Sequence, residues 1–74
     1  MKSVEEIQRK LTDVKSRPAN FENDIIIGYL ECALNHKEYW LHHLLNHYKF
    51  DIREDEIIVR TLEWILDEAN NNEI

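Results

Sequence analysis

The chain has 74 residues, of which 43% are hydrophobic, and it contains one glycine, one proline and one cysteine. This composition predicts one folded domain over residues 1–74. A lone cysteine excludes a disulfide framework and a cysteine-based zinc site. The formal net charge is −6, with seven acids and seven bases up to residue 49 and eight acids and two bases after it, which argues against binding to nucleic acid or to an anionic membrane surface. No apolar run approaches the ~20 residues of a membrane span and the start lacks a secretory signal, so we expect a cytoplasmic protein.

The first predicted helix begins at Ser3. Ser3 and Glu6 have the spacing of a capping box, in which the serine accepts a hydrogen bond from the third helical residue and the glutamate reaches back. Apolar residues then recur at helical spacing, as one narrow stripe: Val4, Ile7, Leu11 and Val14. Pro18 ends this helix, because the residue before a proline disfavours helical dihedrals.

The second predicted helix is long, from about residue 21 to about residue 48. Its apolar residues keep one register throughout, on a face formed by Ile26, Leu30, Ala33, Leu41, Leu44 and Tyr48 and widened by Ile27, Leu34 and Leu45. An intact helix of this length measures about 38 Å, whereas a compact chain of this size is only about 30 Å across. The helix therefore bends near Asn35, or a partner covers its exposed length. A third alternative makes Asn35 an N-cap with Glu38 at the third helical position, which splits the segment. The unbroken register favours one helix.

The third predicted helix follows a turn at residues 49–51. Asp51 and Glu54 have N-cap spacing, and the acids of the first turn suit the helix dipole. The expected core stripe is Ile58, Leu62, Ile65 and Ala69, and the asparagine run at 70–72 ends the helix. Because both connections are short, the sequence predicts an all-α, three-helix antiparallel bundle with a long central helix.

Histidines are the main chemical feature of the sequence. His43 and His47 are four residues apart, a spacing at which two imidazoles of one helix can hold one metal ion. A metal-binding protein that uses this pair is our alternative hypothesis. However, Leu44 stands where a zinc protease motif has glutamate, and no third ligand is evident. Cys32 and His36 can touch, but a thiol in an amphipathic helix is usually a small buried apolar group. We therefore expect no metal, no cofactor and no catalytic residue.

Large aromatic residues flank the predicted core stripes and form a second line on two helices. One stripe for each helix is enough for a monomeric bundle, so a second line that contains aromatics indicates a contact surface for a partner. The predicted partner-binding residues are Tyr29, Trp40, His43, His47, Ile57 and Trp64.

Self-association is the partner that the sequence predicts first. The central helix is too long for a compact monomer, and a symmetric dimer would cover both its exposed length and the second line. Domains below ~70–80 residues also often rely on oligomerisation. We expect a homodimer.

Two segments carry a resemblance to a known group. They are GYLECAL at 28–34 and TLEWILDE at 61–68, after a short, capped amphipathic start. With them the chain resembles small acidic helical-hairpin proteins encoded by phages and prophages of low-GC Gram-positive bacteria. It departs from their pattern in the histidine-rich segment 35–48, which separates the two motifs. The resemblance implies a non-enzymatic, often oligomeric accessory protein. The leading hypothesis is thus a helical protein–protein interaction protein, with itself and a host or phage protein as partners, which acts as an inhibitor through an acidic and aromatic surface.

Overall fold

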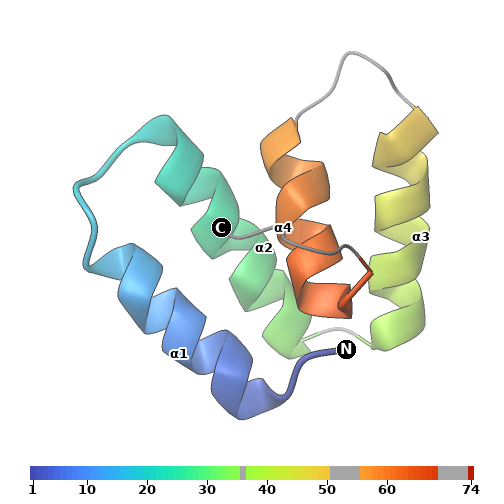
Figure 1. The fold of residues 1–74 in the computed structure, drawn as a ribbon, viewed down its shortest axis with the longest axis horizontal. Helices are drawn as coiled ribbons and strands as arrows, with labels where there is room; N and C mark the ends of the chain where they lie inside the picture. Colours follow the sequence, from blue (N-terminus) through green and yellow to red (C-terminus); the bar gives the residue numbers. More distant parts are fainter. Residues whose placement is uncertain (36, 51–55, 69–73) are drawn as a thin grey trace.

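The structure is a computed structural model that describes residues 1–35, 37–50, 56–68 and 74, with the backbone alone at 49 and 50. The described residues form helices and no strand, which confirms the all-α prediction. The four helices are α1 (Val4–Lys15), α2 (Phe21–Asn35), α3 (Glu38–Phe50) and α4 (Glu56–Leu66). Figure 1 shows two antiparallel pairs, α1 with α2 and α3 with α4, and α4 lies between α2 and α3.

The start of α1 agrees with the capping box that the sequence predicts. The Ser3 hydroxyl accepts a hydrogen bond from the Glu6 backbone N–H at 3.2 Å, and the Glu6 carboxylate accepts one from the Ser3 N–H at 3.5 Å. Ile7 and Val14 are buried. Val4, the first residue of the predicted stripe, is 57% exposed. It is also the first residue of α1.

The single long central helix is wrong, and so the bundle has four helices in place of three. Asn35 ends α2, and its side-chain amide donates to the Glu31 carbonyl at 2.9 Å. This bond satisfies one of the carbonyls that a helix end leaves without a partner. Asn35 is therefore a C-terminal residue of α2 and not the N-cap of the next helix. The break lets the chain fold into principal dimensions of 31 × 25 × 23 Å, which a 38 Å helix would exceed.

The helix break also changes which side chains of α3 reach the core. Leu41 is fully buried as predicted. Leu45, which the unbroken register placed at the edge of the face, is fully buried too, while Leu44 and Tyr48 are only half-buried. A continuous register assumes one helix axis, and α3 has an axis of its own. Its core line is consequently rotated toward Leu45.

Helix α4 supplies the centre of the core. Ile58, Leu62 and Ile65 are buried as predicted, and Leu66 is buried with them. Ala69 and the asparagine run 70–72 lie outside the described residues, as do the N-cap candidates Asp51 and Glu54. None of the helices that the structure describes is both long and apolar enough to cross a membrane.

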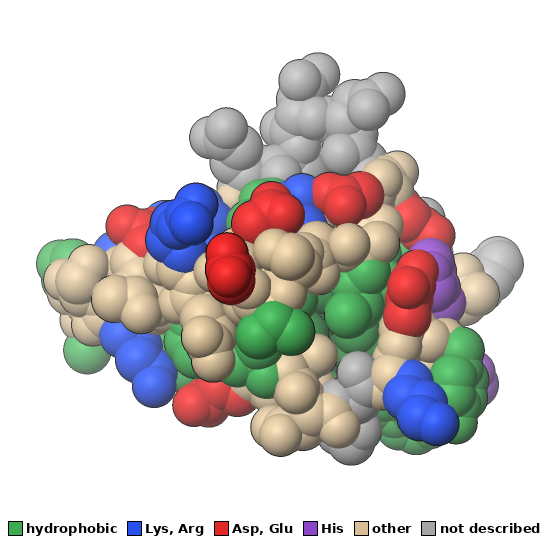
Figure 2. Space-filling model, turned by 90° about the horizontal axis from the view of Figure 1, so that it is seen from below, with side chains coloured by type: hydrophobic (Ala, Val, Ile, Leu, Met, Phe, Trp, Pro, Cys, Tyr) green, Lys and Arg blue, Asp and Glu red, His purple; other side chains and the backbone are tan. Residues whose placement is uncertain are grey.

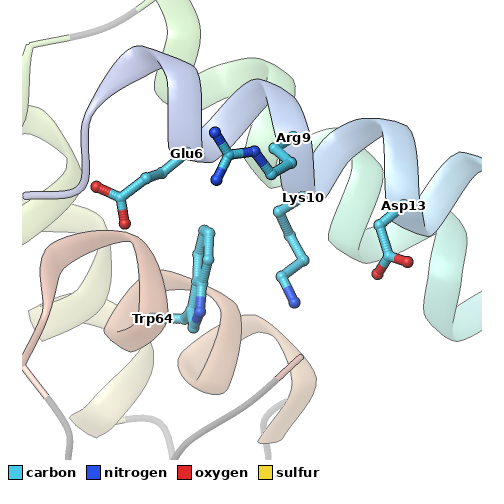
Figure 3. A pocket seen from close by; sticks show the side chains of 5 residues that line it. All are labelled: Glu6, Arg9, Lys10, Asp13 and Trp64. Carbon is cyan, nitrogen blue, oxygen red and sulfur yellow. The ribbon is translucent and has the colours of Figure 1, made fainter.

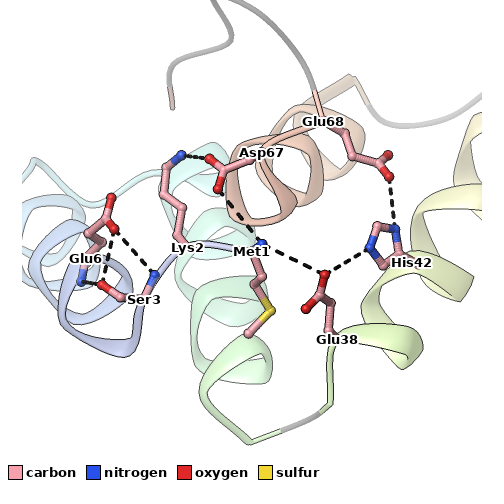
Figure 4. Close-up of polar contacts among 8 residues, drawn as sticks. All are labelled: Met1, Lys2, Ser3, Glu6, Glu38, His42, Asp67 and Glu68. Atoms are coloured by element: carbon pink, nitrogen blue, oxygen red, sulfur yellow. Dashed lines mark hydrogen bonds and ion pairs between the residues drawn. The ribbon is translucent and has the colours of Figure 1, made fainter.

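The segment before α1 holds the end of α4. The Lys2 backbone N–H donates to the Ile65 carbonyl at 2.8 Å, and the Lys2 ammonium pairs with Asp67 (Figure 4). Asp67 has a positive φ of 57°, and the Glu68 N–H donates to the Glu63 carbonyl at 3.0 Å. These are the marks of a left-handed helix end, a position at which aspartate is tolerated better than most residues.

Candidate protein-binding surface

Two neighbouring aromatic side chains are exposed where α3 begins. Tyr39 is 72% exposed and Trp40 is 41% exposed. The Trp40 ring stacks on His43, with ring centres 5.6 Å apart and planes inclined by 29°. Trp40, His43 and His47 have the spacing of one helix face, and His43 and His47 are both exposed. We call Tyr39, Trp40, His43 and His47 the α3 aromatic surface.

A shallow hollow adjoins the α3 aromatic surface. It has a volume of about 400 Å³ and is lined by Asn35, Lys37, Tyr39 and Trp40. Figure 2 shows hydrophobic side chains together with a basic side chain and a histidine at the end of the molecule that α3 occupies in Figure 1. The hollow lies where α2 ends and α3 begins.

Tyr29 connects this face to α2. Its hydroxyl lies 3.2 Å from the Tyr48 hydroxyl, and the two rings meet edge to face with centres 6.3 Å apart. The His47 ring packs edge to face against the Tyr48 ring, with ring centres 5.2 Å apart. The structure thus brings four predicted residues, Tyr29, Trp40, His43 and His47, to the same pair of helices. Tyr29 and Tyr48 are half-buried, and Tyr48 contacts the surface through His47.

Ile57 and Trp64 lie elsewhere. Ile57 packs against the hydrophobic core from α4. Trp64 faces α1, where the ammonium groups of Lys2 and Lys10 lie 4.7 and 5.3 Å from the centre of its ring. Thr61, which lies between them in the sequence, is fully buried, and its hydroxyl donates to the Ile57 carbonyl at 2.7 Å. The second line of α4 therefore makes contacts within the chain.

The predicted pair, His43 and His47, has no third candidate ligand beside it among the described residues. Within the ranges that the structure describes, no group of three or more histidine, cysteine, aspartate or glutamate side chains is placed to hold an ion. His43 and His47 each contact an aromatic ring. Cys32 is half-buried, and burial raises the pKa of its thiol, which opposes nucleophilic chemistry at neutral pH. Its predicted neighbour His36 lies outside the described residues.

Sequence reasoning missed Tyr39 and His42. His42 links α3 to the segment that follows α4: its Nδ1 lies 3.0 Å from Glu68 and its Nε2 lies 3.4 Å from Glu38, four residues earlier in α3 (Figure 4). Tyr39 falls on the polar side of the continuous register, so only the helix break would have identified it. For His42, the spacing of four residues from Glu38 was visible in the sequence, but its contact with Glu68 required the tertiary fold.

Charge is distributed unevenly among the helices near the surface. α3 contains a single acidic residue, Glu38, and this is the fewest of the four helices. At the end of α4, Asp67 pairs with Lys2, and Glu68 contacts His42. The acids that a basic partner would meet there are thus already engaged within the chain.

Comparison with family models, with curated proteins and with solved structures gives no match.

Proposed function

We propose that this protein is a non-enzymatic helical interaction protein, which associates with a second copy of itself through the α3 aromatic surface. The observation that carries the proposal is the adjacent exposure of Tyr39 and Trp40, at 72% and 41%, on a helix whose opposite side packs in the core. Aromatic side chains of this kind are enriched at the centres of protein interfaces, because they bury a large apolar area at little entropic cost.

The charge distribution supports a second copy as the occupant. Two chains of net charge −6 repel each other, so a self-contact needs a face on which acids are few. α3 satisfies this requirement, since Glu38 is its only acid. A two-fold axis beside Trp40 would place the aromatic surface of each chain on that of the other, as symmetric dimers do.

The histidines make this association sensitive to pH. In a two-fold interface His43 and His47 of one chain approach the same residues of the other, so protonation places like charges opposite each other. Among the described residues, Trp40 and Tyr48 are the rings that contact these two imidazoles, and neither carries a charge that would offset the repulsion. We expect the dimer to weaken between about pH 7.5 and about pH 5.5.

Sedimentation velocity at tens of micromolar tests the proposal. We expect the wild-type chain to be a dimer at about pH 7.5 and Trp40→Ala to be a monomer under the same conditions. Phe21→Ala is the matched control, because Phe21 is an aromatic residue that is 78% exposed at the start of α2, and it should remain dimeric. Circular dichroism of both variants verifies that they are folded.

A wild-type monomer at both pH values, or a Trp40→Ala variant that still dimerises, would contradict the proposal. A dimer that does not respond to pH keeps the aromatic contact but places the histidines outside it. If the wild-type chain is monomeric, a host or phage protein becomes the partner to seek, as the resemblance to phage-encoded proteins implies. No contact in the described chain favours the metal-binding alternative.

A further inference from the structure

A second surface feature lies on the opposite side of α4 from α3. It is a groove of about 360 Å³ between α1 and α4, lined by Glu6, Arg9, Lys10, Asp13 and Trp64 (Figure 3). The four α1 residues recur at helical spacing and line one side, and the Trp64 indole stands opposite them. The volume is within the range of small-molecule sites, about 300–1,000 Å³.

Both carboxylates of the groove are already engaged within the chain. Glu6 is held by the capping box, where it accepts hydrogen bonds from the Ser3 N–H at 3.5 Å and from the Ser3 hydroxyl at 3.2 Å. Asp13 pairs with the Arg17 guanidinium at 2.8 Å. Asp13 therefore has a charged partner, whereas Glu6 keeps its negative charge and is held in place by neutral hydrogen-bond donors.

The basic residues are engaged unequally. Lys2 lies over the Trp64 ring and is paired with Asp67. Lys10 also lies over the ring, and it donates to the Ile74 carbonyl at 3.2 Å. Among the residues that the structure describes, the Arg9 guanidinium has no hydrogen-bond or ion-pair partner. Figure 3 shows Arg9 beside the outer edge of the Trp64 ring. The groove thus presents an unpaired guanidinium next to an indole.

We infer that the groove between α1 and Trp64 binds a planar aromatic carboxylate, with the carboxylate on Arg9 and the aromatic ring against the indole. A guanidinium binds carboxylates through two parallel hydrogen bonds, and such charged bonds are stronger than neutral ones. An indole also packs favourably against another ring edge to face, a contact that leaves Lys2 and Lys10 over the Trp64 ring. Neither group alone selects this ligand, but together they require an anion and a planar apolar part within one small molecule.

The residues that line the groove favour a ligand with a single negative charge. Glu6 and Asp13 remain formally negative at the rim, so a dianion such as a phosphate monoester meets more repulsion than a carboxylate does. Lys10, the next residue of α1 after Arg9, also lines the groove and adds a second positive charge. The net charge of the lining is therefore balanced, and one carboxylate makes it negative by only one unit.

Proton–nitrogen correlation spectra of the labelled chain, titrated with 2-naphthoate, test this inference. The two tryptophans give separate indole N–H signals, so each surface has its own reporter. We expect the Trp64 signal to shift and saturate with a dissociation constant on the order of 1 mM, while the Trp40 signal stays in place. Arg9→Gln should weaken binding about tenfold, since it removes the charged hydrogen bonds but keeps a side chain of similar shape.

The controls separate the two parts of the site. Arg60→Gln alters an exposed arginine of α4 outside the groove and should bind like the wild type. The uncharged 2-naphthylmethanol should bind about tenfold more weakly than 2-naphthoate, and acetate should show no saturation. The inference is overturned if the Trp64 signal does not move, if Trp40 moves in its place, if Arg9→Gln binds as tightly as the wild type, or if acetate binds as well as naphthoate. The spectrum of each variant also reports whether it is folded.

Discussion

Trp40 and Trp64 flank the apolar core stripes of their helices at similar angles on a helix wheel. In the folded chain, however, their surroundings differ. Trp64 is half-buried on the side of α4 that faces α1, with the ammonium groups of Lys2 and Lys10 over its ring. Trp40 is 41% exposed in the first turn of α3 and stacks on His43, which is itself exposed.

The difference arises from the neighbours that each helix has. α4 is the central helix and packs against α2 and α3 (Figure 1), and its Trp64 also meets Lys10 of α1 and Lys2 of the segment before α1. α3 is an outer helix whose main contact is with α4. A flanking aromatic on a central helix meets another part of the chain, whereas one on an outer helix meets solvent or a partner. An aromatic at the edge of a stripe therefore indicates an interface only when the helix lies at the periphery.

The largest expected effect concerns the core that supports both tryptophans. Leu62→Ala or Leu41→Ala should lower the free energy of unfolding by about 2–5 kcal/mol, because each side chain is fully buried and leaves a cavity. Urea unfolding followed by circular dichroism measures the change. A loss below about 1 kcal/mol in either variant would show that α3 and α4 do not pack as the structure has them.

Alanine substitution of the tryptophans themselves tests the comparison. Trp64→Ala should lower the free energy of unfolding by about 2–3 kcal/mol, since it removes packing between α4 and α1 together with two cation–π contacts. Trp40→Ala should cost less than about 1 kcal/mol when measured at a concentration low enough for the chain to be monomeric. Equal losses in the two variants would remove the distinction between an internal and an external tryptophan.

The cap of α1 tests whether this helix stabilises Trp64. Ser3→Ala removes the capping hydrogen bond to the Glu6 N–H and should cost about 1 kcal/mol. Glu6→Gln is the matched control, because glutamine can also complete a capping box and should have a smaller effect. In Ser3→Ala the fluorescence of Trp64 should respond before that of Trp40 during unfolding. A stability equal to that of the wild type would mean that the cap contributes nothing.

The smallest effect concerns Cys32, which lies on the half-buried flank of α2. Because burial raises the pKa of its thiol, the folded chain keeps this proton at a pH where the unfolded chain releases it. The corresponding stability is fully present below the ordinary thiol pKa of 9.0 and is lost as the pH rises above it. Alkylation by iodoacetamide at about pH 8 should be slower in the folded chain than in urea, and similar rates would contradict this burial.

Local signals in the sequence were sufficient for much of the fold. The capping box of Ser3 and Glu6 and the buried residues Ile58, Leu62 and Ile65 follow from neighbours within one or two turns, so they could be predicted. The break at Asn35 could not be chosen over a continuous helix, because the apolar register is compatible with both. The compactness of the whole chain decides between a broken and a continuous helix. The hydrogen bond from the Asn35 side chain to the Glu31 carbonyl stabilises only the end of α2.

The sequence predicted only part of the candidate surface, again because it did not identify the break at Asn35. Tyr29, Trp40, His43 and His47 belong to α2 and α3, and a helix wheel finds them on one flank even with the break unrecognised. Tyr39 was missed because the break reorients the first turn of α3. Ile57 and Trp64 were grouped with these residues because a helix wheel gives the angle of a side chain but not the helix beside it. For Trp64 the neighbouring helix is α1.

Fluorescence of the two tryptophans during dilution tests the central claim most directly. Trp64→Phe leaves Trp40 as the sole tryptophan, and Trp40→Phe leaves Trp64. We predict that dilution through the dimer–monomer transition shifts the emission of Trp40 to longer wavelength, because its ring becomes more exposed to water when the second copy leaves. The emission of Trp64 should stay constant. A shift confined to Trp64, or none in either variant across a transition seen by sedimentation, would contradict the account.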